Sequence, residues 1–150
     1  MKPVIGVIPA RLASTRFPEK PLALIAGQSM ISHVVRGALR SKKIQQVWVA
    51  TDDNRIADEA RKAGASVVMT DSDLPSGTDR VWAATEKLDC DVIVNIQGDE
   101  PLIEASHIDA LIEPFLLDPN LQMGTLAHKL TDIELQSANS VKVLLDQNSN

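Results

Sequence analysis

Three cations and two hydroxyl groups fall within ten residues near the start of the chain. The segment from Arg11 to Lys20 also contains Arg16, together with Ser14 and Thr15. Arginine offers a planar fork of N–H donors and lysine a compact charge, and both groups bind phosphate oxygens well. Prolines flank the segment and limit its chain entropy. This composition predicts a loop that binds a polyphosphate.

The cationic segment matches neither of two common phosphate-binding motifs. The spacing G-x-x-x-x-G-K-[ST] of a P-loop is absent. No G-x-G-x-x-G follows the first apolar run, so a dinucleotide-binding fingerprint is absent too.

A carboxylate follows a later apolar run. Asp99 lies between Gly98 and Glu100, directly after residues 91–96. Mg²⁺ prefers carboxylate oxygens together with substrate phosphates, so Asp99 is a candidate metal ligand. Gly98 would let the backbone approach a ligand closely or adopt a positive φ. Alternatively, the two acids begin the next helix, where negative charge favours the N-terminal dipole, and this interpretation is stronger for Glu100.

Four short apolar runs, rich in β-branched residues, are typical of strands buried on both faces. Helix-forming segments separate these runs. The strands are expected at residues 3–9, 47–51, 67–70 and 91–96; the helices at 31–39, from Asp53 or Asn54 to Ala63 before Gly64, from the capping residue Thr78 to Leu88, and at 105–117 with a disturbance at Pro114. The alternation predicts an α/β fold, a Rossmann-like doubly wound and mainly parallel sheet with helices on both faces.

The alternation weakens after Gln122. Residues 123–129 and 140–146 have the pattern of strands without a long helix between them.

Histidines are spaced too widely to suggest a metal site, and Trp48 and Trp82 are expected to pack in the core.

In an open α/β sheet, ligands bind beyond the carboxyl ends of the strands, near the point where the strand order reverses. The cationic segment follows the first expected strand, and Asp99 follows the fourth. We therefore expect Lys20 and the Asp99 carboxylate at one mouth of the protein, where they would hold a metal-bound nucleotide. Wide separation of the two groups would contradict this hypothesis.

Composition and charge exclude several other classes. The net charge is −5, and apolar residues make up 44% of the chain, as in globular proteins. Residues 1–43 contain eight bases and one acid, whereas residues 88–128 contain eight acids and no Lys or Arg. An isoelectric point near 5.1 argues against nucleic-acid binding. A lone cysteine and the lack of a long apolar run favour a cytoplasmic protein without a membrane span.

Three motifs in chain order resemble those of 3-deoxy-manno-octulosonate cytidylyltransferases. They are Pro9 to Leu22, Ser76 to Arg80, and Gln97 to Pro101. The resemblance implies a fold of the nucleotide-diphospho-sugar transferase type. It implies transfer of CMP from CTP to 3-deoxy-manno-octulosonate (Kdo), an eight-carbon sugar acid, with Mg²⁺ as cofactor and CMP-Kdo and pyrophosphate as products for lipopolysaccharide biosynthesis.

The resemblance also implies roles for individual residues. Those expected to hold the triphosphate and act in catalysis are Arg11, Arg16 and Lys20, with Asp99 as the metal ligand and Ser14 as a weaker phosphate contact. Those expected around the nucleoside are Ser76, Gly77, Arg80 and Gln97, with Pro9 and Ala10 completing the nucleotide-binding set.

The resemblance further divides the chain into a nucleotide-binding core, residues 1–122, and the incomplete start of a sugar-binding and dimerisation part, residues 123–150. Family members are longer, and their later half supplies sugar contacts, a second metal-binding aspartate and most of a homodimer interface. We therefore interpret the chain as a truncated, N-terminal portion.

Three alternatives remain at this stage. Leu74-Pro75 stands where family members commonly have His-Gln, so the 8-amino relative of Kdo is an alternative substrate. The chain could also bind a nucleotide without catalysis. A sugar-1-phosphate nucleotidylyltransferase is less consistent with the sequence, because residues 10–20 contain no glycine where those enzymes need a glycine-rich loop.

Overall fold

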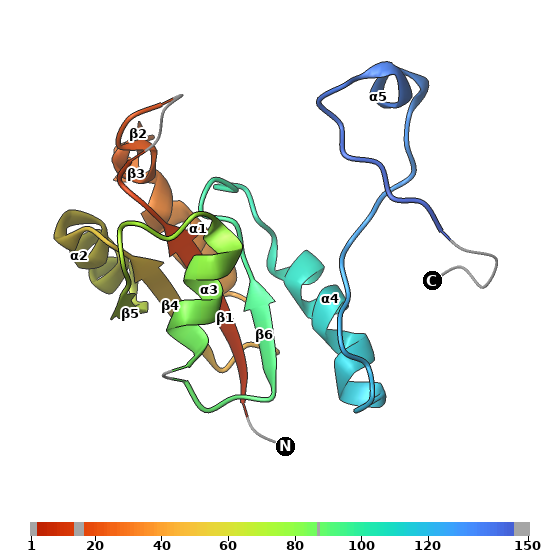
Figure 1. Ribbon diagram of the computed structural model, residues 1–150, viewed down its shortest axis with the longest axis horizontal. Coiled ribbons are helices and arrows are strands. Elements are labelled where there is room, and N and C mark those ends of the chain that lie inside the picture. The colour runs from red at the N-terminus through yellow and green to blue at the C-terminus, as the bar shows by residue number, and fades with distance from the viewer. Residues whose placement is uncertain (1–2, 14–16, 87, 146–150) are drawn as a thin grey trace.

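The computed structural model describes residues 3–13, 17–86 and 88–145 (Figure 1). The predicted residues Ser14 and Arg16 therefore lie outside the described part of the chain. In chain order the elements are β1 (Val4–Ala10), the 3-10 helix η1 (Lys20–Leu22), β2 (Leu24–Ile25), β3 (Gln28–Ser29), α1 (Met30–Ala38), β4 (Gln46–Thr51), α2 (Asn54–Ala63), β5 (Ser66–Met69), α3 (Gly77–Thr85), β6 (Val92–Asn95), α4 (Ala105–Leu117) and α5 (Asp132–Gln136).

Four parallel strands form the main sheet in the order β5-β4-β1-β6. The register of β1 runs from Ile5 opposite Gln46 to Ala10 opposite Thr51 on the β4 side, and Val4 lies opposite Val92 on the β6 side. The chain thus moves outward from β1 to β5 and then returns to the other side of β1. This reversal between β1 and β6 is the switch point at which α/β sheets bind ligands.

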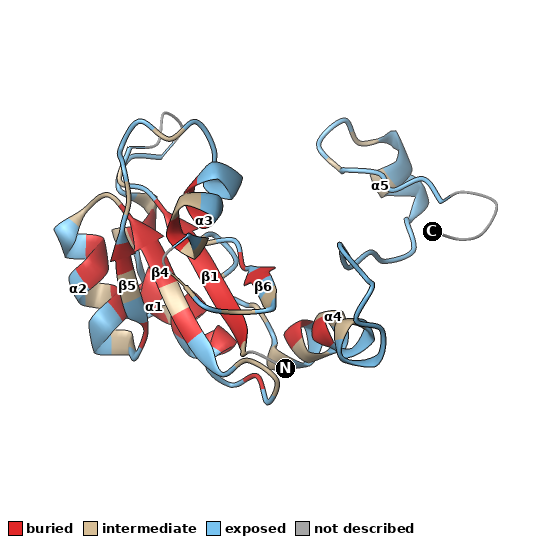
Figure 2. Cartoon of the chain, turned by 60° about the horizontal axis from the view of Figure 1, so that its bottom comes forward, coloured by how far each residue is buried: buried red, intermediate tan, exposed pale blue. Residues whose placement is uncertain are grey.

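Both faces of the sheet are covered, as the sequence predicts. Successive side chains of a strand point to opposite faces. Ile8 of β1 therefore packs in one buried cluster, with side chains of α1, α2 and α4, and Val7 packs in the other, against α3. Figure 2 shows β1 buried along its whole length at the centre of these layers. The α/β, doubly wound fold is confirmed.

Capping residues determine where α2 and α3 begin and where α2 ends. Helix α2 begins as predicted, because the Asp53 side chain accepts hydrogen bonds from the backbone N–H groups of Arg55 and Ile56. It ends at Gly64, whose φ of 104° is a conformation that glycine adopts without strain. The prediction that Thr78 caps α3 is wrong: Ser76 is the cap, and its hydroxyl accepts the N–H of Asp79.

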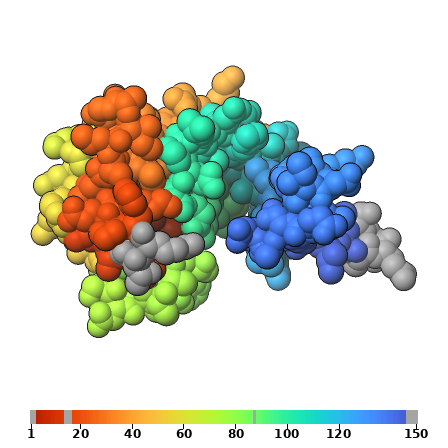
Figure 3. All heavy atoms as spheres, turned by 90° about the horizontal axis from the view of Figure 1, so that it is seen from above, coloured from red at the N-terminus to blue at the C-terminus, as the bar shows by residue number. Residues whose placement is uncertain are grey.

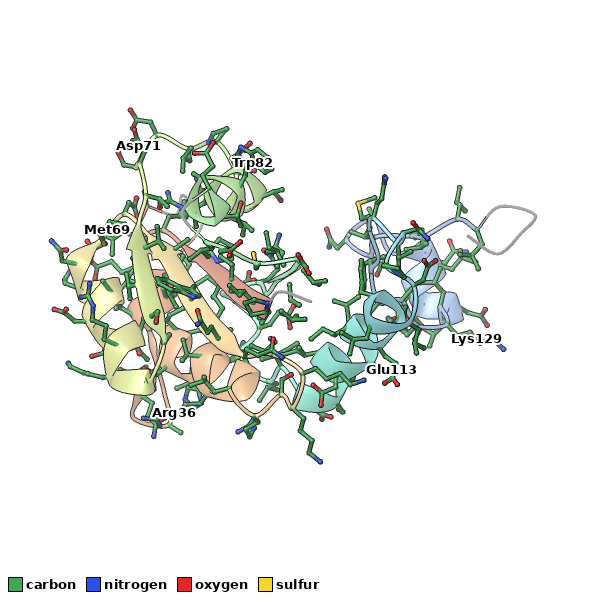
Figure 4. All side chains as sticks on the ribbon, turned by 90° about the horizontal axis from the view of Figure 1, so that it is seen from below. Arg36, Met69, Asp71, Trp82, Glu113 and Lys129 are labelled. Atoms are coloured by element: carbon green, nitrogen blue, oxygen red, sulfur yellow. The ribbon has the colours of Figure 1, made fainter. Side chains whose placement is uncertain are left out.

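Other expectations have mixed outcomes. Helix α4 has the predicted bounds, Ala105–Leu117, and includes Pro114, which lacks the N–H for one helix hydrogen bond. Trp82 is 69% exposed, since it lies on the outer side of α3 (Figure 4), away from the buried face that carries Val81 and Ala84. Trp48, by contrast, is half-buried against the second core cluster, as expected.

The strands predicted at 123–129 and 140–146 are absent from the described part of those ranges. A strand requires a hydrogen-bonded neighbour, and no strand of the described chain pairs with them. This segment instead contains the five-residue helix α5 and extends away from the sheet in Figure 1. Almost all of its side chains are exposed, including Met123 and Leu144.

The short hairpin of β2 and β3 was not anticipated from the sequence. Its turn contains Ala26 with φ 49° and Gly27 with φ 81°, and two successive positive φ angles fit the tight turns that join paired strands. The hairpin connects η1 to α1.

The cap of α2 gives a first prediction. Asp53→Ala should lower the free energy of unfolding by about 1 kcal/mol, the usual contribution of an acidic N-cap. Burial disfavours the charge on Asp53, but hydrogen bonds from the Arg55 side chain and from the Arg55 and Ile56 amides outweigh it and lower the pKa of this carboxyl below 3.8. Urea denaturation measures the difference between wild type and variant.

The sign of the pH dependence follows from that lowered pKa. Because the folded state favours the ionised form, the contribution of Asp53 is fully present above pH 3.8 and disappears as the pH falls through the lower folded value. Asp58→Ala is the matched control, because it removes an exposed acid of the same helix that pairs with Arg61 and should cost no more than about 0.5 kcal/mol. Equal losses for both variants would contradict the capping role.

Candidate functional site

The Lys20 ammonium and the Asp99 carboxylate meet at the carboxyl end of the sheet. Lys20 Nζ lies 2.7 Å from Asp99 Oδ2 and donates a hydrogen bond to it. Lys20 is the first residue of η1, which follows β1, and Asp99 lies in the turn after β6. Figure 3 shows the red-orange N-terminal part beside the blue-green segment that follows β6. The juxtaposition expected from strand topology is therefore present.

This ion pair is open to solvent. The side chains of Lys20 and Asp99 are 38% and 51% exposed, so water screens their attraction. Exposed pairs of this kind contribute about 0–1 kcal/mol. A ligand that carries both a polyanion and a cation can therefore separate the two groups at little energetic cost.

A close backbone contact fixes the turn that carries Asp99. The N–H of Ile96 donates to the Val7 carbonyl over 2.9 Å, which continues the pairing of β6 with β1. A Cβ atom at position 98 would lie 2.7 Å from the Pro9 carbonyl oxygen. Gly98 is thus required because its backbone touches the end of β1, and it does not have a positive φ. One of the two reasons anticipated for this glycine, a positive φ, is therefore wrong.

A cavity of about 250 Å³ lies above these strand ends. The predicted site residues that line it are Pro9, Ala10, Arg11, Lys20, Gly77, Arg80, Gln97 and Asp99. Pro21 and Gly98 complete its lining. Residues from three distant motifs of the sequence therefore surround one space.

A second hollow of about 570 Å³ shares Arg11 with this cavity. It lies between the loop after β1, including Leu12 and Glu19, and the end of β4, where Asp52 and Asp53 are found. Small-molecule sites commonly occupy 300–1,000 Å³. The larger hollow falls within this range, and the smaller cavity lies slightly below it.

Two of the residues predicted around the nucleoside, Ser76 and Gln97, make contacts elsewhere. Ser76 does not line the cavity, because its hydroxyl caps α3 and hydrogen-bonds to Asp79. Gln97 is exposed and donates from Nε2 to Asn95 Oδ1 over 2.9 Å. Gln97 also borders a groove of about 790 Å³ between β6, α4 and residues 118–125, which the sequence did not indicate.

Arg80 is buried beneath the cavity, with an exposure of only 1%. Its Nη1 donates to Thr70 Oγ1 over 2.5 Å, and its Nη2 lies 3.6 Å from Asp52 Oδ2. Asp52 and Thr70 were missed as site-supporting residues. A signal for Asp52 was available, since it follows the expected strand 47–51 as Asp99 follows 91–96.

Backbone contacts define the base of the loop after β1. The N–H of Glu19 donates to the Leu12 carbonyl over 3.3 Å, and Glu19 has a φ of 56°, which is uncommon for a residue with a side chain. Arg55 donates to the Glu19 carboxylate over 2.8 Å. Hydrogen bonds to Asp53 and then Glu19 raise the pKa of Arg55 above its ordinary value. The loop is thereby attached to the start of α2.

The described residues contain no group of three or more His, Cys, Asp or Glu side chains that could hold a metal ion. In the same ranges, no helix combines the length and apolar character that a bilayer crossing requires.

Comparison with known proteins places this arrangement in a family. A sequence profile described as cytidylyltransferase matches residues 5–150. The chain belongs to the cytidylyltransferase family.

Relatives within the family agree closely with the chain. It is 52% identical over 143 residues to a 3-deoxy-manno-octulosonate cytidylyltransferase of Bdellovibrio bacteriovorus, covering 95% of this chain and 58% of the relative. A protein of the same name from Trichlorobacter lovleyi is 47% identical over 146 residues, covering 97% of this chain and 58% of the relative. The chain thus spans a little over half the length of these curated cytidylyltransferases.

Solved structures of the family have the same fold. A CMP:2-keto-3-deoxy-manno-octonic acid synthetase complexed with CTP matches with a TM-score of 0.76 and 41% identity, over 79% of this chain and 49% of that chain. A cytidylyltransferase from Leptospira borgpetersenii matches with a TM-score of 0.70 and 27% identity, over 80% of this chain and 51% of that chain. The α/β fold of the nucleotidyltransferases is thereby shown.

The close contact at Gly98 gives a second prediction. Gly98→Ala places a methyl group against the Pro9 carbonyl and should lower the free energy of unfolding by on the order of 1–3 kcal/mol, as overpacking does. Gly77→Ala is the control, because its Cβ would lie 3.4 Å from Pro9 Cγ, an ordinary contact. Urea denaturation of both variants is the measurement, and an undisturbed Gly98→Ala protein would show that the turn does not depend on this contact.

Proposed function

We propose that the protein is a 3-deoxy-manno-octulosonate cytidylyltransferase and that this chain supplies its nucleotide-binding part. The reaction would transfer CMP from CTP to Kdo and release pyrophosphate. The observation that carries the proposal is the contact of Lys20 with Asp99 in a cavity lined by residues of all three motifs. The names of the relatives at 52% and 47% identity, and the CTP complex of a matching structure, support CTP and Kdo as substrates.

Arg11 and Lys20 would bind the triphosphate. Arg11 lines both hollows, and Lys20 lies at the edge of the smaller one with its charge partly exposed. Both cations can donate to phosphate oxygens and reduce the repulsion that an approaching nucleophile meets. Arg16 and Ser14, from the same loop, remain predictions for further phosphate contacts.

Asp99 would hold Mg²⁺. A site with one protein carboxylate fits this ion, because Mg²⁺ keeps several waters and takes other ligands from substrate phosphates. When bound, the ion would neutralise phosphate charge and favour departure of pyrophosphate. The present partner of Asp99 is Lys20, so that binding of the metal nucleotide would exchange one ion pair for two, Asp99 with the metal and Lys20 with a phosphate.

The nucleoside would lie against the residues after β1 and at the start of α3. Pro9 and Ala10 end β1, and Gly77 opens α3 with no side chain above Pro9. Arg80 and Gln97 supply hydrogen-bond donors around the same cavity. Ser76 would act on the nucleoside through the position of α3, since its hydroxyl is engaged as the helix cap.

In the proposed reaction, the anomeric hydroxyl of the sugar attacks the α-phosphorus in line with the bond to the β-phosphate. A new P–O bond to the sugar forms, the bond to pyrophosphate breaks, and the hydroxyl proton is released. Arg11 and Lys20 would stabilise the charge that develops on the phosphate oxygens. Loss of one such contact costs on the order of 3 kcal/mol, or about a hundredfold in rate.

We further propose a cytoplasmic homodimer for the whole protein. The exposed apolar side chains beyond α4, including Met123, Val141 and Leu144, offer contact surface for association. A reaction that consumes CTP and releases pyrophosphate is expected in the cytoplasm.

The third prediction concerns nucleotide choice. In titrations with Mg²⁺ present, the chain should bind CTP roughly tenfold or more tightly than UTP, ATP or GTP, a difference of about 1.4 kcal/mol. Isothermal titration calorimetry measures the four affinities, and an assay of released pyrophosphate, run with Kdo, follows turnover. We expect little or no release, because binding of CTP does not by itself supply the sugar contacts. Equal affinities for the four nucleotides would overturn the assignment.

The fourth prediction tests Asp99. Asp99→Asn should abolish the part of CTP affinity that depends on Mg²⁺, measured as the difference between titrations with Mg²⁺ and with EDTA. Glu100→Gln is the matched control, since it removes the same charge one residue away on an exposed side chain. Thermal melting of both variants checks that they remain folded. A full Mg²⁺ effect in Asp99→Asn would remove the metal role from this residue.

A further inference from the structure

The carboxylate of Asp52 makes two contacts in different directions. Its Oδ1 accepts the backbone N–H of Leu12 over 3.3 Å. Its Oδ2 lies 3.6 Å from Nη2 of Arg80, and the side chains of Asp52 and Arg80 are only 10% and 2% exposed. One buried carboxylate therefore contacts both the loop after β1 and the guanidinium beneath the cavity.

The contact with Arg80 supplies charge compensation. Nη2 of Arg80 is buried, and no described group accepts a hydrogen bond from it. A buried cation without an opposite charge is costly, and water cannot screen it there. The carboxylate of Asp52, held beside Nη2, therefore keeps the charged Arg80 in its place, while Thr70 holds Nη1.

The contact with Leu12 fixes the loop that carries Arg11. The N–H of Leu12 donates to Asp52, and the carbonyl of Leu12 accepts the N–H of Glu19. Both backbone groups of Leu12, its N–H and its carbonyl, are therefore hydrogen-bonded. Arg11 precedes it directly and lines both hollows, so that the position of Leu12 determines where the Arg11 side chain begins.

We propose that Asp52 is a positioning residue that holds the triphosphate-binding loop and Arg80 in one fixed arrangement. The inference rests on the proposed function, which places the triphosphate of the ligand at Arg11 and its nucleoside near Arg80. Asp52 lines the larger hollow but not the smaller cavity, and its carboxylate oxygens are directed to Leu12 and Arg80, through which we infer that it acts. The negative charge of Asp52 would repel a triphosphate. If Asp52 acted only through this charge, its removal would tighten triphosphate binding, whereas removal of a positioning residue would weaken it.

Two substitutions separate the two contacts. Asp52→Asn keeps a side-chain oxygen that can accept the Leu12 N–H but removes the charge opposite Arg80. Asp52→Ala removes both contacts. Asp58→Asn serves as the control, because it changes the charge by the same amount on the exposed surface of α2.

The test compares CTP with inorganic tripolyphosphate, both with Mg²⁺, by calorimetry. Asp52→Asn should weaken CTP binding by about tenfold and leave tripolyphosphate binding within about twofold, since only the Arg80 contact is lost. Asp52→Ala should weaken both ligands by about tenfold. Tighter binding of tripolyphosphate by both variants would show that Asp52 acts only through its charge, and would overturn the proposal.

A measurement without ligand distinguishes this proposal from the proposed function. Amide hydrogen exchange at Leu12, followed by NMR, should be about tenfold faster in Asp52→Ala and nearly unchanged in Asp52→Asn. If wild-type chain binds CTP no better than other nucleotides but Leu12 behaves in this way, the nucleotide assignment fails while the positioning of the loop stands. Unchanged exchange in Asp52→Ala would overturn the loop contact whatever the chain binds.

Thermal melting excludes a purely structural explanation. A general structural role would lower the melting temperature of both variants while the folded protein binds both ligands as wild type does, and that result would overturn the proposal. Should Asp52→Ala fail to fold, Asp52→Asn alone decides. Equal losses of CTP and tripolyphosphate affinity in that variant would contradict the separation of the two contacts.

Discussion

Opposite charges brought together at the ends of two adjacent parallel strands are the constraint on which the rest of the site depends. β1 and β6 are neighbours only because the chain returns across the sheet after β5. That return places Asp99 beside Lys20, although 79 positions separate them in the sequence. The pair is exposed and weak, which suits a site whose ligand must replace each partner of the pair with a stronger one.

The backbone holds this arrangement more firmly than the ion pair does. Gly98 touches the Pro9 carbonyl, and this contact fixes the turn of Asp99 against β1. The N–H and the carbonyl of Leu12 are both hydrogen-bonded. The charged side chains thus extend from a rigid base. Backbone groups that already have these partners lose little further conformational entropy when a ligand binds.

Much of this could be predicted from sequence because it depends on local pattern and on one topological rule. Apolar β-branched runs predict β1 and β4, and the rule that ligands bind at strand ends is enough to place Lys20 and Asp99 at one site. The burial of Arg80 could not be predicted in the same way. Thr78 and Asp79, which precede it on α3, are exposed, and its partner Asp52 follows β4, far away in the sequence, so only the packed structure shows that the guanidinium is covered.

Two of the wrong predictions, the strand at 123–129 and the burial of Trp82, share a physical origin in partners that the sequence pattern does not specify. The strand predicted at 123–129 would need an adjoining edge for pairing, and the outer edge of β6 pairs with no strand of the described chain. Trp82 fails for a related reason: its apolar neighbours in sequence lie on a different side of α3. Periodicity identifies which side chains share a face of an element, whereas burial depends on what lies opposite that face. Arg80 and Trp82, two residues apart on one helix, show the difference, since the charged residue is covered and the aromatic one faces solvent.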